Sequence, residues 1–199
     1  MTFVTGKRCA TILYSDPLCP ASHCARIVLA EKGIPFDVVD ADTEAHPYQH
    51  IPTLVDRDLV LYDLRVIMEY LDERYPHPPL MPVDPVSRAM TRLVVHRMER
   101  EWYSLVKDML DGEGDRAEQA RQRFAQGLHD IAPLFHKKAF FVNDGFSLAD
   151  CCMAPLLWRL DHYGIELSPQ AAPLLNYAQR LFDRDAFKSS LSLPEREMQ

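Results

Sequence analysis

The sequence predicts a mixed α/β half followed by an all-α half, with a proline-rich connector between them. In the first half, short apolar runs of strand length alternate with helical spacing, whereas the second half shows helical spacing throughout. Between the halves, five prolines fall within residues 76–85. Because proline fixes φ and lacks an N–H, neither flanking helix can continue through this stretch. We therefore predict domains over residues 1–76 and 86–199, joined by a connector over 77–85.

The first half begins with a strand, a helix and a second strand. Residues 9–14 form a short apolar run that ends at Ser15-Asp16-Pro17, which is typical of a buried strand. Residues 21–32 have helical spacing, and Gly33 follows as a C-cap. Residues 36–39 form the second strand. A helix between two strands predicts a right-handed crossover, so these strands should be parallel.

A hairpin and a second helix complete this half. Residues 51–55 and 59–61 flank Asp56-Arg57-Asp58, which predicts a hairpin. Residues 63–74 form a helix with four residues predicted on one buried face, namely Val66, Ile67, Tyr70 and Leu71. The resulting order, β-α-β-β-β-α, is that of a thioredoxin-like domain.

Two connections in this half lack regular structure. Residues 41–50 are polar and interrupted by Pro47, so this stretch is too short for a substantial helix. Pro52 stands where the third strand begins and cannot donate to the ladder. In a thioredoxin-like half we expect the Ile51–Pro52 bond to be cis, which would expose the neighbouring backbone to a ligand; a trans edge proline is the alternative.

The second half is predicted to be helical from residue 86 onward. One long helix over 86–110 ends at Asp111-Gly-Glu-Gly114, and a second covers 117–135. Ser147-Leu-Ala-Asp150 has the spacing of a capping box and opens a third helix. Shorter helices follow over 171–182 and 185–190, and the polar tail after Leu193 should be frayed. The core candidates of the two long helices are Leu93, Met98, Trp102, Leu105, Phe124, Leu128 and Ile131.

Composition excludes several functional classes. The net charge of −7 disfavours direct, sequence-specific DNA binding and suits contact with a basic protein partner. No apolar run reaches the ~20 residues that span a bilayer, and the N-terminal residues lack the apolar core of a signal peptide. The odd set of cysteines fits free thiols in a reduced cytoplasm: Cys9, Cys19, Cys24, Cys151 and Cys152.

Two groups of residues could carry chemistry. Cys19 begins Cys19-Pro20-Ala21-Ser22 at the start of the first helix, where a helix N-terminus stabilises a thiolate. It is the one plausible nucleophile, and a passive residue is the alternative. His46 and His50 have the spacing of a metal-ligand pair, but Pro47 interrupts the helix between them. Because no third ligand follows at a convincing spacing, we predict a solvated loop and no metal site.

The connector itself has two interpretations. It is stiff because of its prolines, and it contains one histidine, His77. It is either a spacer between the two halves or a surface whose shape is fixed for recognition.

Several stretches resemble known families. The Ile51-Pro-Thr-Leu54 run, residues 69–76 and the Ser147–Asp150 box together resemble the glutathione S-transferase family. The match is closer to the stringent starvation protein A family of Gram-negative bacteria, which four segments resemble: residues 26–33, 51–57, 68–83 and 154–160. The resemblance covers roughly residues 8–198, and residues 76–79 are its most specific part.

This resemblance implies a homodimeric protein that binds RNA polymerase holoenzyme, including its primary sigma factor, and regulates transcription during stress. It implies no transferase activity, no catalytic residue and no cofactor. The dimer should form on the face between the helix over 63–74 and the helix from Val86. The acidic residues Asp72, Glu73 and Asp84 could meet basic residues of the polymerase. The implied partner-binding residues are Tyr75, Pro76, His77, Pro78, Pro79 and Leu80.

The residues at the expected glutathione site support loss of catalysis. Transferases hold the γ-glutamyl end of glutathione with an acidic residue followed by Ser, whereas this chain has Asp63-Leu64. Losing a buried hydrogen bond to a charged group costs roughly 1.5–3 kcal/mol, which is about one to two orders of magnitude in affinity. In transferases a helix in the region of residues 41–50 also contributes to this site, and here that region is too short for a substantial helix. Relatives commonly have an aromatic residue where Asp84 stands, so no aromatic contact is expected there.

Two alternatives remain open at this point. The first is a glutathione-dependent thiol transferase that uses Cys19. The second is a dimeric scaffold that binds another partner through the same proline-rich surface.

Overall fold

A four-stranded mixed sheet organises the first half. The strand order is β2-β1-β3-β4, formed by β1 (Thr11–Ser15), β2 (Asp37–Asp40), β3 (Thr53–Asp56) and β4 (Leu59–Leu61). β1 is parallel to β2 and antiparallel to β3, and β3 and β4 form an antiparallel pair. The predicted parallel pair and hairpin are therefore confirmed. The computed structural model describes residues 11–41, 48, 50–142 and 145–198, so the start of the predicted first strand and most of residues 41–50 lie outside it.

The first helix, α1 (Pro20–Lys32), ends where the sequence predicts. Gly33 has a left-handed φ of 61°, and its N–H donates to the Ala30 carbonyl. This geometry is the C-cap for which glycine is preferred. The Ile51–Pro52 bond is cis, as expected, and a second cis bond, which was not predicted, joins His77 to Pro78.

The second helix, α2 (Leu64–Arg74), begins after Asp63, whose carboxylate accepts a hydrogen bond from the Val66 N–H. Ile67 and Leu71 are fully buried, as predicted. Val66 was predicted to lie on the same face but is 50% exposed. One helical residue turns about 100°, so a face centred on Ile67 and Leu71 leaves Val66 at its edge.

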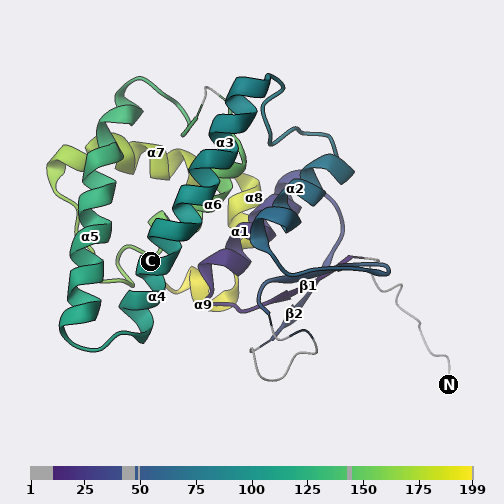
Figure 1. Cartoon of the computed structure of the whole chain (residues 1–199), viewed down its shortest axis with the longest axis horizontal. Coiled ribbons are helices and arrows are strands. Elements are labelled where there is room, and N and C mark those ends of the chain that lie inside the picture. Colours follow the sequence, from purple (N-terminus) through teal and green to yellow (C-terminus); the bar gives the residue numbers. More distant parts are fainter. Residues whose placement is uncertain (1–10, 42–47, 49, 143–144, 199) are drawn as a thin grey trace.

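The second half is helical, and Figure 1 shows its helices extending away from the sheet. Its elements are α3 (Pro85–Arg97), the π-helical segment η1 (Met98–Tyr103), α4 (Ser104–Asp111), α5 (Asp115–Ile131), the 3₁₀ turns η2 (Ala132–His136) and η3 (Pro169–Ala171), α6 (Leu148–Trp158), α7 (Ala172–Phe182), α8 (Asp185–Ser190) and α9 (Leu193–Arg196).

The predicted helix over 86–110 is a helical run with a π-helical segment at its middle. Met98 and Leu105 are buried as predicted, whereas Leu93 is 51% exposed and was wrongly placed in the core. Leu93 belongs to an outer face of α3, where apolar spacing does not reflect packing within this chain.

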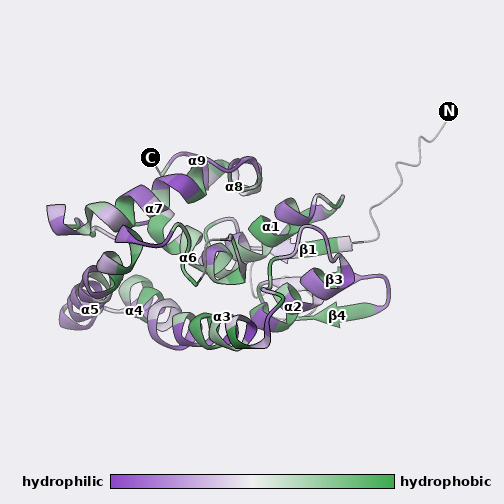
Figure 2. Cartoon of the chain, turned by 90° about the horizontal axis from the view of Figure 1, so that it is seen from above, coloured by the Kyte–Doolittle hydropathy of each residue, from purple (hydrophilic) through white to green (hydrophobic). Residues whose placement is uncertain are grey.

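α6 is the central helix of the molecule. Its residues from Leu148 to Leu157 are all buried, and Figure 2 shows it between a layer of α3 and α4 and a layer of α7, α8 and α9. The predicted capping box is present: the Asp150 carboxylate accepts from the Ser147 N–H at 2.8 Å. It also accepts from the Tyr177 hydroxyl at 2.7 Å, so the cap joins α6 to α7. α1 packs against both α6 and α8, which joins the two halves.

Candidate functional site

The proline segment, defined as residues 75–80, leaves the end of α2 and lies at the surface. Pro76, His77, Pro78 and Pro79 are exposed, and Tyr75 is half-buried. The segment therefore presents one imidazole and three pyrrolidine rings to solvent, from a backbone with few rotatable bonds.

Hydrogen bonds from the interior fix this segment from behind. The buried Asp72 carboxylate accepts from the Leu80 N–H at 2.7 Å and from the Met81 N–H at 3.1 Å. It also pairs with the Lys32 Nζ at 2.6 Å, and the same Nζ donates to the Pro78 carbonyl at 2.6 Å. α1 and α2 thus each provide a buried charged side chain that holds the backbone of the segment, and its shape exists before any partner binds.

Two of the predicted contact residues have other roles. Leu80 was predicted to face the partner, but its side chain is 2% exposed and belongs to the core. It anchors the segment, because the Leu80 carbonyl also accepts from the Leu148 N–H at 2.9 Å. Asp72 was expected to meet a basic partner, but its oxygens are already occupied by Lys32 and the segment backbone.

The other acidic residues near the segment are exposed. Glu73 lies at the surface beside it. Asp84 caps α3 by accepting from the Ser87 N–H at 2.8 Å, and this backbone hydrogen bond lowers the pKa of the Asp84 carboxyl. Neither the Lys32–Asp72 pair nor its role was predicted, because 40 residues separate the two positions and no local pattern connects them.

The residues expected at the glutathione site lie in the first half and differ in exposure. Cys19 is the N-cap residue of α1 and is partly exposed, whereas Cys24, Cys151 and Cys152 are buried. Asp63 caps α2, and the Leu64 side chain after it is buried and has no hydroxyl to offer. His50 stacks on Tyr62 with ring centres 5.1 Å apart, and His46, four residues earlier, lies outside the described residues.

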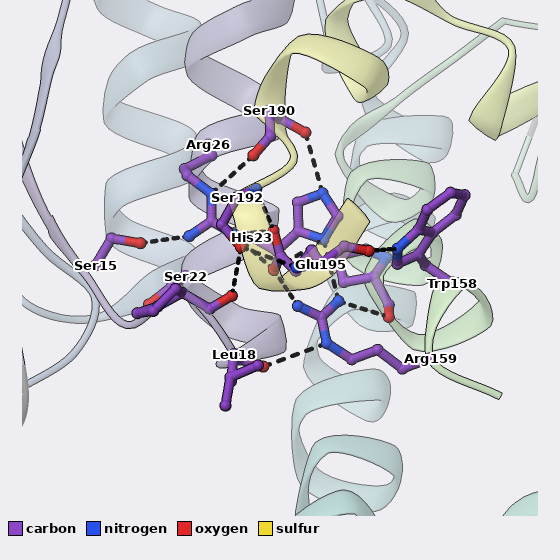
Figure 3. Close-up of polar contacts among 12 residues, drawn as sticks. Ser15, Leu18, Ser22, His23, Arg26, Trp158, Arg159, Ser190, Ser192 and Glu195 are labelled. Carbon is purple, nitrogen blue, oxygen red and sulfur yellow. Dashed lines mark hydrogen bonds and ion pairs between the residues drawn. The ribbon is translucent and has the colours of Figure 1, made fainter. Parts of the chain in front are cut away.

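A buried charged cluster lies where α1 and α6 meet the C-terminal segment (Figure 3). This arginine–glutamate cluster consists of Arg26, Arg159 and Glu195, all of them buried. One guanidinium nitrogen of Arg26 lies 2.6 Å from each oxygen of Glu195, and Arg159 also pairs with this carboxylate.

His23 borders the cluster and is neutral. Burial lowers its pKa well below the usual value, and the charges of Arg159 and Arg26 lower it further. Its Nε2 lies 3.0 Å from the Ser190 hydroxyl, and its Nδ1 lies 3.0 Å from Arg159. The cluster therefore holds two guanidinium cations against one carboxylate.

The cluster corrects the prediction of a frayed tail. Residues after Leu193 begin with the short helix α9, and the Glu195 side chain is completely buried. The Trp158 indole N–H donates to the Glu195 carbonyl at 2.8 Å. The Ser192 hydroxyl donates to the Pro17 carbonyl at 2.8 Å, so the tail also holds the loop that precedes Cys19. Local composition could not reveal this, because the cations that bind Glu195 lie 36 and 169 residues away.

Exposed apolar side chains lie on α2, on α3 and just before α2, and we refer to them together as the apolar stripe. Its members are Tyr62, Val66, Val86, Met90 and Leu93. Part of it borders a groove of about 510 Å³ between α3, η1 and α5, with Trp102 and Ile131 in its walls. In the described part of the chain, no helix has both the length and the apolar character needed to cross a membrane.

Comparisons with known proteins agree with this architecture. Residues 13–79 match the glutathione S-transferase N-terminal domain, and residues 114–180 match the C-terminal domain. A rice glutathione S-transferase solved with glutathione superposes with a TM-score of 0.83 at 21% identity, over 96% of each chain. A glutathione S-transferase from Rhodospirillum rubrum gives 0.82 at 25% identity, over 92% of each chain.

Curated relatives narrow the family. The stringent starvation protein A homolog of Coxiella burnetii is 48% identical, over 96% of each chain. The homolog of Haemophilus ducreyi is 43% identical, over 96% of this chain and 94% of its own. A probable maleylacetoacetate isomerase of Drosophila melanogaster is more distant, at 29% identity over 90% of this chain and 80% of its own. The chain therefore belongs to the stringent starvation protein A family, within the glutathione S-transferase-like superfamily.

Proposed function

We propose that this protein is a cytoplasmic transcription regulator that associates with RNA polymerase holoenzyme, including its primary sigma factor, and has no glutathione transferase activity. The contact is made by protein surface alone, through Tyr75 and residues 76–79. The observation that carries this proposal is the Lys32–Asp72 pair, which fixes an exposed proline segment from inside the fold. A surface that is already ordered loses little conformational entropy when a partner docks on it.

The chemistry of the segment suits a protein partner. The prolines offer rigid apolar contact, and the His77 imidazole offers one hydrogen-bond donor and one acceptor. Glu73 adds an exposed carboxylate beside them. Leu80 is not part of this contact surface, because it is buried.

A triple substitution tests the contact surface. Replacing Pro76, His77 and Pro78 by alanine should leave the circular dichroism spectrum unchanged but abolish co-purification with the holoenzyme. A matched control replaces an exposed proline and histidine elsewhere, Pro133 and His136, and should retain polymerase. Unchanged recovery of polymerase with the triple variant would reject the assignment, and recovery of a different partner would favour the scaffold alternative.

We further propose that the protein is a homodimer joined through the apolar stripe on α2 and α3. Large exposed apolar patches on a protein surface mark sites of contact with another protein. Met90 is a member of the stripe and is 47% exposed. Replacing Met90 by Glu should produce monomers in sedimentation velocity, whereas Leu175→Glu, on α7 and similarly exposed, should not.

The second candidate function is a glutathione-dependent thiol transferase that uses Cys19. One observation favours it: Cys19 is partly exposed at the start of α1, where a helix N-terminus stabilises a thiolate.

A comparison of wild type with Cys19→Ser separates the two functions. Our first proposal expects no retention on a glutathione matrix and no removal of glutathione from a mixed-disulfide substrate. Retention, together with activity that disappears in Cys19→Ser, would establish the enzyme instead.

A further inference from the structure

Two cysteines from different halves of the chain meet in the core. Cys24 lies on α1 and Cys152 on α6, and their sulfur atoms are 3.6 Å apart. The Met68 sulfur, on α2, lies 3.3 Å from the first and 3.6 Å from the second. Both thiols are completely buried. Three sulfur atoms from three helices thus share one site at the junction of the halves.

We propose that Cys24 and Cys152 are a modification site, at which a peroxide converts the two thiols into a disulfide that ties α1 to α6. The peroxide first oxidises one thiol to a sulfenic acid and leaves as water. The second thiol then attacks that sulfur, the S–S bond forms, and a second water leaves. In total, two thiols and one hydrogen peroxide give one disulfide and two waters.

The geometry requires only a small displacement. A disulfide has an S–S distance of about 2.05 Å, so the two sulfurs must approach by roughly 1.5 Å. Side-chain rotation can supply part of this, because α1 and α6 are already in direct contact. The Met68 thioether is flexible and can move aside without leaving a polar group unpaired.

Cys151 provides a natural comparison. It is adjacent to Cys152 in sequence and equally buried, but successive helical positions point about 100° apart. The sulfur of Cys152 lies 3.6 Å from both the Cys24 and the Met68 sulfur. The arrangement therefore favours Cys152 over its neighbour.

Burial also predicts how the reaction depends on peroxide. Desolvation raises the pKa of the Cys24 thiol well above its usual value, so this thiol is protonated at rest and slow to react. Peroxide must reach the site through a local opening of the junction. The oxidation rate should rise with peroxide concentration and then level off when this opening becomes limiting.

The disulfide would close a loop between positions 128 residues apart and should raise the unfolding midpoint. It would also fix the surroundings of Met68 on α2, the helix that leads into the proline segment. Oxidation would thus stiffen the base of the exposed surface.

The test uses the full chain. Wild-type protein is treated with hydrogen peroxide, free thiols are alkylated in denaturant, and non-reduced peptides are identified by mass spectrometry. We expect a peptide pair joined through Cys24 and Cys152, and an unfolding midpoint that rises on oxidation and returns with dithiothreitol. Cys151→Ala should retain the linked pair, whereas Cys24→Ala and Cys152→Ala should lose it.

Three results would overturn the proposal. They are recovery of Cys24 and Cys152 as alkylated thiols after the partly exposed Cys19 has been oxidised, their conversion to separate sulfinic acids, and pairing of either with another cysteine. The wild-type peptide map decides among these outcomes even if a substitution at the junction prevents folding.

Discussion

Replacing Glu195 by alanine is the perturbation for which the structure gives the clearest expectation. The carboxylate is completely buried and lies between the guanidiniums of Arg26 and Arg159. In the part of the chain that the structure describes, no other carboxylate contacts either guanidinium. The substitution therefore leaves two buried cations that face each other without a counter-ion.

The expected cost follows from this arrangement. Removing one partner of a buried ion pair costs about 3–5 kcal/mol, because the remaining charge stays desolvated. The substitution also removes the acceptor of the Ser192 N–H at 2.8 Å and so weakens the cap of α9. For a chain of this size, such a loss lowers the melting temperature by roughly 6–20 °C.

The assay is unfolding in guanidinium chloride, monitored by tryptophan fluorescence. Trp158 donates to the Glu195 carbonyl, so its emission also reports whether α9 remains docked. Glu197→Ala is the matched control, because Glu197 is an exposed residue of the same type two positions away and should cost less than about 0.5 kcal/mol. If Glu195→Ala costs no more than Glu197→Ala, the tail does not depend on the buried cluster, and our interpretation is wrong.

Three further substitutions test other parts of the fold. Asp72→Asn leaves the buried Lys32 ammonium unpaired and should cost about 3 kcal/mol in chemical unfolding; wild-type stability would contradict a structural role for the pair. Asp150→Asn weakens the hydrogen bonds that the Asp150 carboxylate accepts from the Ser147 N–H and the Tyr177 hydroxyl, and it should cost at least about 2 kcal/mol in the same assay; wild-type stability would show that the cap is unimportant. Burial raises the pKa of Glu99 to about 7, although the charge of Arg65 opposes this. Folded protein then binds more protons than unfolded protein between about pH 4.5 and 7, so Glu99 makes stability fall as pH rises through this window. Melting curves at pH 5 and pH 8 should show Glu99→Gln gaining stability relative to wild type at the higher pH, and an equal difference at both would refute the assignment.

Local signals predicted most of the first half. The sequence predicted a C-cap at Gly33 and favoured a cis bond before Pro52, and both are present. The capping box at Ser147 was likewise predicted, because its partners are three residues apart. The local spacing could not show that the Tyr177 hydroxyl, which belongs to α7, donates to the same Asp150 carboxylate.

The candidate site was predicted in outline only. Composition identified the proline segment as stiff, but the Lys32–Asp72 pair that holds it depends on the packing of α1 against α2. Leu80 was assigned to the surface because its neighbours are exposed, whereas its backbone turns it into the core. Glu195 is the largest omission: a polar tail sequence predicts solvation, and only the folded chain brings two arginines to it.

The docking of α9 has a consequence for the order in which the protein is made. Arg26 is translated early, and its counter-ion Glu195 follows 169 residues later. Domains generally begin to fold from the N-terminal side while synthesis continues. The ion pair at the base of the first half therefore cannot form until Glu195 has been synthesised.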